Sequence, residues 1–125
     1  MSIEGITMDD ELTRTAMTII LHAGDARSAI RKAYDALATG DRPAAEAALA
    51  TARTEIRKAH RAQTGLLQDE ARGARHSVTL LFSHAQDTLM TINSEVVTAA
   101  NVITVFDSLD RRITALEAQS AGRQQ

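Results

Sequence analysis

Apolar residues return every three or four positions along three long segments of this chain, which is the spacing of one face of an α-helix. In the first segment, from residue 9 or 10 to about 38, they are Leu12, Ala16, Ile19 or Ile20, Ala23, Ile30, Ala33 or Tyr34, and Leu37. In the second, which runs to about residue 70, a near-unbroken heptad series comprises Ala45, Leu49, Ala52, Ile56, Ala59, Gln63 and Leu66. In the third, from 77 to about 117, the series is Ala85, Leu89, Ile92, Val96, Ala99, Ile103 and Phe106. Each segment is therefore predicted to be an amphipathic helix.

Residues typical of helix ends stand at the boundaries of these segments. Gly40 follows the last periodic residue of the first segment, and glycine readily adopts the left-handed conformation that ends a helix. Asp41 is the predicted N-cap of the second helix, and Pro43 lies in its first turn, where no backbone N–H is needed. Residues 71–76 lose the period and contain a glycine, so they are the second predicted turn. Ser77 is then the expected N-cap of the third helix.

Three long helices with short connections predict an all-α, antiparallel three-helix bundle with up-down-up order. The length of 125 residues suits one domain, which we place at residues 9–118. Residues 1–8 show no period, and residues 119–125 are polar, so both ends are expected to be disordered. Aromatic residues make up only 2% of the chain, so the core is expected to depend on close helix–helix contact.

A second stripe runs along the third predicted helix, away from its apolar series. At 100° per residue its members fall within about 40° of one another. They are Leu80, Asp87, Thr91, Thr98, Val105 and Leu109. A helix with two stripes needs its own bundle on one side and something else on the other, most economically the same helix from other copies of the chain.

Composition excludes several classes of function. The formal net charge is −2 with both signs interspersed, which gives no electrostatic basis for binding nucleic acid. Cysteine is absent, which removes disulfides and thiolate chemistry and is typical of a cytoplasmic protein. The N-terminal residues are acidic where a secretory signal is basic and apolar. The longest apolar run, Val96–Phe106, is shorter than the roughly 20 residues of a membrane span, so no direct membrane insertion is expected.

The candidate for chemistry is His84, near the start of the third helix. An imidazole titrates near pH 6.5, so much of it is neutral and nucleophilic at neutral pH, and its attack on a phosphoryl donor would give a phosphoramidate. Ser83, Gln86 and Thr88 are candidates to donate hydrogen bonds to the phosphoryl oxygens. By itself, a lone histidine is more often structural than catalytic.

The remaining histidines are weaker candidates. His22, His60 and His76 lack the spacing of a metal-binding motif. His60 and Gln63 are interpreted as a buried polar layer on the second helix. Asp25 is expected to make a salt bridge or an interhelical hydrogen bond.

Three sequence blocks together resemble a known family. Residues 77–91 read SVTLLFSHAQDTLMT, residues 23–28 read AGDARS and residues 59–65 read AHRAQTG. The first block resembles the phosphohistidine segment, H-A-Q-D-H-L-M, of the enzyme IIA component of sugar phosphotransferase systems (PTS) of the lactose/cellobiose (chitobiose) class. The likeness spans roughly residues 8–116. Thr88 stands where that signature has its second histidine.

This resemblance implies a phosphotransferase component that carries phosphohistidine at His84. It would receive the phosphoryl group from the histidine-containing phosphocarrier protein and pass it to the cysteine of a IIB component, for uptake of a lactose-, cellobiose- or chitobiose-type sugar. Thr88 leaves an alternative open, a non-catalytic helical adaptor or regulator that kept the scaffold and weakened or lost the transfer.

Asp87 is the candidate metal ligand. It lies on the second stripe, where burial of an unpaired carboxylate is costly, and carboxylates that converge around a symmetry axis need a proton or a cation between them. Oxygen ligands suit Mg²⁺ or another divalent ion. The resemblance implies a coiled-coil-like homotrimer with one divalent cation, Mg²⁺ by this chemistry, held on the axis by Asp87. The residues by themselves do not fix three copies rather than two.

Overall fold

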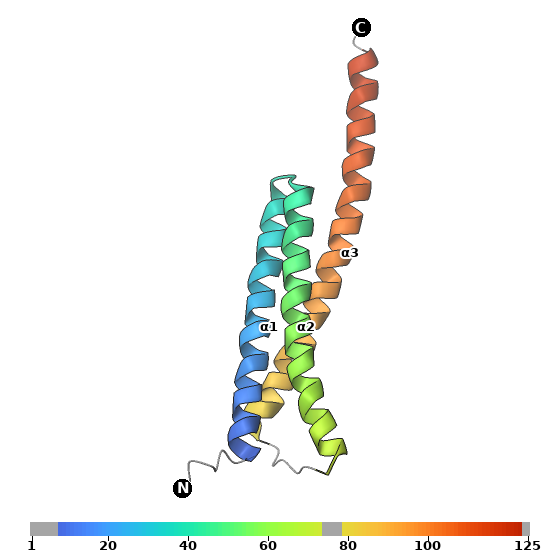
Figure 1. The fold of residues 1–125 in the computed structure, drawn as a ribbon. Coiled ribbons are helices and arrows are strands. Elements are labelled where there is room, and N and C mark those ends of the chain that lie inside the picture. The colour runs from blue at the N-terminus through green and yellow to red at the C-terminus, as the bar shows by residue number, and fades with distance from the viewer. Residues whose placement is uncertain (1–7, 74–78, 124–125) are drawn as a thin grey trace.

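The computed structural model describes residues 8–73 and 79–123, which form three helices in an antiparallel, up-down-up arrangement (Figure 1). Helix α1 spans Met8–Ala38, α2 spans Arg42–Ala71 and α3 spans Leu80–Arg123. The described part of the chain contains no strand. The predicted all-α fold and its three helices are confirmed.

The core lies along the apolar stripes that the sequence spacing indicates. Alanines with no exposed surface recur along all three helices, and small side chains allow helix axes to approach closely. Ile19, Leu89 and Ile92 are the largest side chains buried completely. The core cluster comprises Ala16, Ile19, Ala23, Ala26, Ala29, Ile30, Ala33, Leu37, Ala45, Leu49, Ala52, Ile56, Ala59, Ala85, Leu89, Ile92, Val96, Ala99 and Ile103.

The turn between α1 and α2 follows the predicted chemistry. Gly40 has a φ of 77°, and the backbone N–H of Gly40 donates to the carbonyl of Leu37 at 2.9 Å. The N–H of Asp41 donates to the carbonyl of Ala36 at 2.9 Å, which completes a Schellman-type helix end. The carboxylate of Asp41 then accepts from the N–H of Ala44 at 3.1 Å. One glycine and one aspartate thus end one helix and begin the next.

Helix α3 begins later than predicted, at Leu80. The hydroxyl of Thr79 accepts a hydrogen bond from the N–H of Phe82 at 3.1 Å, as an N-cap does. Thr79 therefore caps α3, and the predicted cap Ser77 lies outside the described residues, as do residues 74–76 of the predicted second turn.

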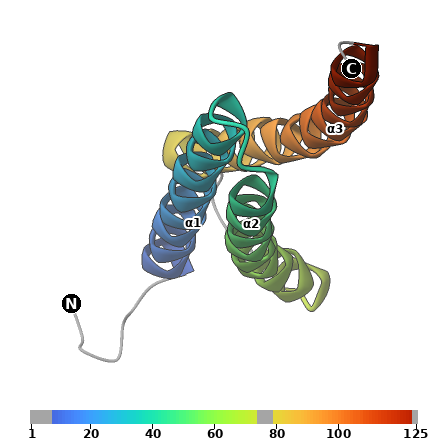
Figure 2. The ribbon, with the colours of Figure 1, turned by 90° about the horizontal axis from the view of Figure 1, so that it is seen from above.

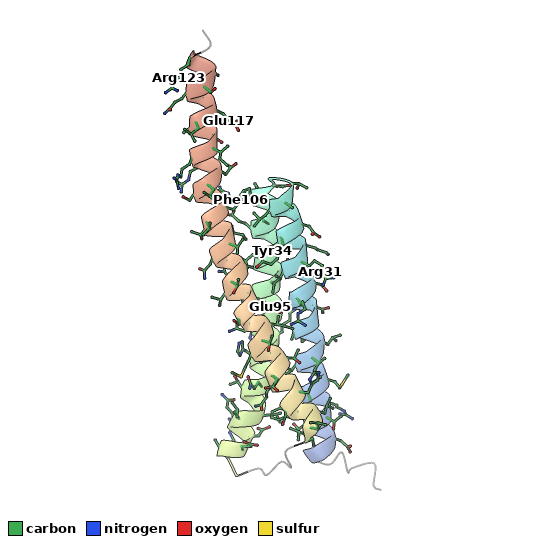
Figure 3. The ribbon with its side chains drawn as sticks, turned by 180° about the vertical axis from the view of Figure 1, so that it is seen from behind. Arg31, Tyr34, Glu95, Phe106, Glu117 and Arg123 are labelled. Carbon is green, nitrogen blue, oxygen red and sulfur yellow. The ribbon has the colours of Figure 1, made fainter. Side chains whose placement is uncertain are left out.

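Helix α3 also ends later than predicted, at Arg123. Residues 119–123, which are expected from the sequence to be disordered, are part of this helix in the structure, while residues 1–7, 124 and 125 lie outside the described part. With 44 residues, α3 is about 66 Å long at 1.5 Å per residue. Phe106 and Asp107 are its last partly buried residues, and residues 108–123 are all exposed. This last stretch projects beyond the α1–α2 turn, with Glu117 and Arg123 on the projecting part (Figures 1 and 3).

The three helices do not pack equally. Helices α1 and α2 lie side by side, and α3 crosses this pair obliquely (Figures 1 and 2). Helix α3 packs more extensively against α1 than against α2. An oblique crossing leaves much of the surface of α3 open, and this surface includes the second stripe.

The predicted buried polar layer on α2 is wrong. His60 is exposed and Gln63 is only half-buried, and no polar side chain is buried among the described residues. The core is instead purely apolar, because His60 is one position away from Ala59, which takes the inward-facing place in the heptad series.

An 18-residue stretch of α3 is apolar enough to pass for a membrane span by length and composition. This stretch is longer than the apolar run Val96–Phe106, from which no insertion into a membrane is expected. The same helix supplies Leu89, Ile92 and Val96 to the core, and the core helix of a soluble bundle meets the same criteria. This composition by itself therefore does not indicate insertion.

Candidate functional site

His84 lies in the second turn of α3 with its side chain exposed. The adjacent Ala85 and the nearby Leu89 have no exposed surface and anchor this part of α3 to the core. Because successive helical residues are rotated by 100°, burial of Ala85 fixes the backbone that presents His84 to solvent. The helix thus holds the imidazole on a rigid support, where a molecule from outside can reach it.

Thr88 lies one turn after His84, and its hydroxyl donates a hydrogen bond of 2.8 Å to the backbone carbonyl of His84. A hydroxyl has a single proton to donate. In this conformation that proton is used by the backbone, so donation to a phosphoryl group at His84 requires the bond to be exchanged. A role for Thr88 in the transfer stays a prediction.

Ser83 and Gln86, the other predicted hydrogen-bond donors, are both half-buried. Residues two apart on a helix do not share a face, so Gln86 projects to a different side from His84. Their roles toward a phosphoryl group also stay predictions.

Asp87 is exposed, three residues after His84, and no hydrogen bond or ion pair to it is found within the described residues. The other members of the second stripe are exposed as well: Leu80 is 88% exposed, Val105 57% and Leu109 48%. Apolar side chains on the same face continue beyond the bundle at Ile113 and Leu116. The predicted second stripe is therefore open along the whole helix.

One chain offers a single carboxylate at Asp87, whereas a divalent cation takes several oxygen ligands. An ion at this position therefore needs Asp87 from more than one copy. Carboxylate oxygens are suitable donors for Mg²⁺, so the residue type fits the predicted ion once copies converge.

Two sets of ion pairs hold α3 against the other helices. The guanidinium of Arg27 on α1 donates to both carboxylate oxygens of Glu95 on α3, at 2.8 and 3.1 Å. This bidentate hydrogen bond raises the pKa of Arg27 above its ordinary value. Near the top of the bundle, Arg42 on α2 pairs with Asp107 on α3, and Arg111 pairs with the other oxygen of Asp107 at 3.2 Å. These ion pairs join α3 to α1 and to α2 at the surface of the bundle.

A hollow of about 250 Å³ lies where α1 meets Glu95. It is lined by Arg27, Arg31, Tyr34 and Asp35 of α1 together with Glu95, and Figure 3 shows the three labelled members Arg31, Tyr34 and Glu95 at neighbouring levels of the bundle. Its two arginines and two carboxylates give it no net charge, so the hollow does not select either anionic or cationic ligands.

A second polar cluster joins α1 to α2. His22 Nδ1 lies 2.7 Å from Glu55 Oε2, and Lys58 Nζ lies 3.0 Å from Glu55 Oε1. The hydrogen bond from Lys58 and then that with His22 lower the pKa of Glu55 below its ordinary value. Asp25 lies in the same cluster, but the salt bridge or interhelical hydrogen bond expected for it is not found among the described residues. The sequence spacing did not reveal it, because His22 and Glu55 are 33 residues apart and meet only through the packing of α1 on α2.

The chain has relatives among proteins of known type. A family model described as "PTS system, Lactose/Cellobiose specific IIA subunit" matches residues 14–107. A lichenan-specific phosphotransferase enzyme IIA component of Bacillus subtilis (strain 168) is 38% identical over 102 residues, which is 82% of this chain and 93% of the relative. A PTS lactose-specific EIIA component of Lacticaseibacillus casei is 42% identical over 82 residues, 66% of this chain and 73% of the relative.

Solved structures agree with this relationship. The crystal structure of the PTS cellobiose-specific enzyme IIA from Bacillus anthracis matches with a TM-score of 0.76 and 32% identity, over 88% of this chain and 98% of that one. The crystal structure of PtcA from S. mutans matches with a TM-score of 0.76 and 38% identity, over 78% of this chain and 96% of that one. The family match ends at residue 107, where α3 leaves the bundle.

Proposed function

This chain belongs to the lactose/cellobiose-specific IIA family of the sugar phosphotransferase system, and from that membership we propose that it is a phosphocarrier whose acceptor is His84. The donor is the histidine-containing phosphocarrier protein, and the recipient is the cysteine of a IIB component. The observation that carries the proposal is the solvent-exposed imidazole of His84, which is rotated by 100° or more from the fully buried Ala85 and Leu89 that hold this part of α3 in the core.

Apart from an exposed imidazole at His84, the transfer needs few groups from this chain. A neutral ring nitrogen of His84 attacks the phosphorus of the donor phosphohistidine, a new P–N bond forms, and the donor P–N bond breaks to release its imidazole. In the second step the IIB thiolate attacks the same phosphorus, an S–P bond forms, and the P–N bond to His84 breaks, which returns the free ring nitrogen of His84. Phosphoryl transfer depends mainly on in-line positioning and charge stabilisation, which a docked partner supplies in part.

The proposed assembly is a homotrimer in which the second stripe of α3 forms the interface. The stripe is exposed in the single chain and carries Leu80, Val105 and Leu109, whose burial is favourable. Asp87 from each copy would lie near the axis, where a divalent cation, Mg²⁺ in our proposal, neutralises the converging carboxylates. The ion has a structural role here, and no step of the transfer passes through it.

The names of the relatives indicate the sugar class. They refer to lichenan, lactose and cellobiose, so we propose uptake of a sugar of this type. We also propose a cytoplasmic location, which suits a chain without cysteine that passes a phosphoryl group between other proteins.

The test is phosphorylation of the purified chain with phosphoenolpyruvate, enzyme I and the phosphocarrier protein, followed by intact mass and acid lability. We expect about one acid-labile phosphoryl group per chain, as one nucleophilic imidazole implies. His84→Ala should abolish the label, while His60→Ala, which removes another exposed histidine, should keep it. A label that persists in the His84→Ala variant would remove His84 from the role.

A second function is favoured by one observation, the hydroxyl of Thr88 bonded to the backbone of His84 where the family signature has a histidine. It is a helical adaptor that no longer transfers phosphoryl groups. The natural chain would then stay unlabelled under the conditions above. Thr88→His separates the two cases. An adaptor that lost transfer only through loss of this histidine becomes phosphorylated when the histidine is restored, whereas an active carrier is already phosphorylated with Thr88 in place.

The assembly is tested separately. Sedimentation velocity should show a species of three chains at micromolar concentration, and Asp87→Asn should remove its dependence on Mg²⁺. A monomer at all concentrations, with or without Mg²⁺, would refute the trimer and leave the phosphorylation test untouched.

A further inference from the structure

We propose that His22, Asp25 and Glu55 form a binding site for a divalent transition-metal ion of the Zn²⁺ class between α1 and α2. Each side chain offers one ligand atom, and these atoms lie within 4.8 Å of one another. His22 and Asp25 are one turn apart on α1, so they share a face, and Glu55 faces them from α2. This site shares no residue with His84 or Asp87 on α3 and does not depend on the phosphocarrier function.

The separations of the ligand atoms, from 2.7 Å to at most 4.8 Å, bracket the spacing that a tetrahedral ion requires. With metal–ligand distances of 2.0–2.2 Å, neighbouring donors around Zn²⁺ lie about 3.3 Å apart. His22 Nδ1 and Glu55 Oε2 are 2.7 Å apart, in a hydrogen bond that an ion would replace. A separation of 4.8 Å exceeds this spacing by about 1.5 Å, so side-chain rotation has to bring the donors closer together around the ion.

The donor set selects the kind of ion. One imidazole nitrogen and two carboxylates match the His and carboxylate ligands of zinc sites that keep an open position. Mg²⁺ and Ca²⁺ prefer oxygen ligands alone and more of them. The site should therefore prefer Zn²⁺ or Co²⁺ to Mg²⁺, the reverse of what is expected at Asp87.

Each carboxylate has an atom available for an ion. Lys58 binds Oε1 of Glu55, which leaves Oε2 toward His22. The carboxylate of Asp25 is exposed and makes no hydrogen bond or ion pair within the part of the chain that the structure describes. A hollow of about 310 Å³ borders Asp25 and Glu55 and offers room for the water that would complete the coordination.

Two lysines set a limit on the affinity. Lys58 is paired with Glu55, and Lys32 lines the hollow beside Asp25. Their positive charges offset much of the negative charge of the two carboxylates, so binding rests on coordination of the imidazole more than on electrostatic attraction. We therefore expect a dissociation constant in the micromolar range rather than that of a closed structural zinc site.

The experiment is titration of the full chain with Zn²⁺ by calorimetry, and with Co²⁺ by visible absorption, which reports a four-coordinate ion directly. The wild-type chain should bind about one ion per chain at this site. His22→Phe keeps an aromatic ring of similar size and should weaken binding at least 10-fold, and Asp25→Asn should weaken it several-fold. The matched control His60→Phe changes an exposed histidine of α2 that lies outside the cluster and should leave binding unchanged.

Two further measurements make the outcome decisive. Circular dichroism must show the same helix content in each variant, and Asp87→Asn must keep the Zn²⁺ affinity, because Asp87 is not part of this site. Equal affinity in the wild-type and His22→Phe chains, or no saturable Zn²⁺ or Co²⁺ binding up to about 100 µM, would overturn the proposal. Neither result would bear on phosphorylation of His84, so failure of this site is distinguishable from failure of the proposed function.

Discussion

Leu89→Ala tests whether α3 packs on the other two helices as the structure has it. Leu89 has no exposed surface and lies five residues after His84, on the buried face of α3. Complete burial of a leucine side chain is worth about 1.5–3 kcal/mol, and the cavity left by leucine-to-alanine changes brings the total to about 2–5 kcal/mol. The fully buried alanines around the core leave few side chains able to fill that cavity. We therefore expect a loss of about 3–4 kcal/mol.

The matched control is Leu21→Ala, the same chemical change at a position that is 64% exposed on α1. It removes about a third as much buried surface and gains slightly in helix propensity, so its cost should be below about 1 kcal/mol.

The measurement is urea unfolding followed by helical circular dichroism, at one chain concentration because oligomers unfold in a concentration-dependent way. For 125 residues, a loss of 3–4 kcal/mol lowers the melting temperature by about 10–15 °C. Equal costs for the two changes would refute the burial of Leu89, and with it the support that presents His84.

Other changes test the remaining elements. Gly40→Ala should lower the free energy of unfolding by about 1–2 kcal/mol, because the φ of Gly40 is 77°. Gly65→Ala, inside α2 with open space around an added Cβ, should raise it by up to about 1 kcal/mol. Changes of the same sign would contradict the idea that the backbone conformation of each glycine decides the effect. Asp41→Ala should cost about 1 kcal/mol through loss of the α2 cap, and Asp41→Ser should recover most of it. Removal of residues 108–125 should change the unfolding free energy of the monomer by less than about 0.5 kcal/mol, since residues 108–123 are all exposed and the ion pair of Arg111 is with Asp107 of the same helix. A larger loss in dilute, monomeric protein would mean that this stretch packs on the bundle.

Much of the fold is predictable from local patterns. The apolar stripes locate nearly every buried residue, because helical spacing decides which side chains can face a common core. The α1–α2 turn follows from Gly40 and Asp41, since their chemistry acts within a few residues. The ends of α3 are less well predicted. Thr79 caps it at one end, and at the other the helix continues through residues 119–123, where the polar sequence predicts disorder although it contains no helix-breaking proline.

Some features of the candidate site are also predictable from the sequence, and one feature of α2 is not. The position of His84 on an exposed face, and of Asp87 on the second stripe, follows from their spacing relative to Leu89 and Ile92, so the sequence by itself determines both. The polar layer predicted at His60 is wrong, because adjacent residues of a helix differ by 100° and only Ala59 faces inward.

Only tertiary structure decides what meets across helices. Two contacts join residues that are 33 and 68 positions apart: the hydrogen bond between His22 and Glu55, and the pairing of Arg27 with Glu95. The oblique crossing of α3 likewise depends on contacts between distant parts of the chain. A sequence pattern indicates which face a residue occupies along its own helix, but not how far that helix slides or rotates against its neighbour. That relative placement comes from the packing of the whole core, and it alone brings His22, Asp25 and Glu55 to one point.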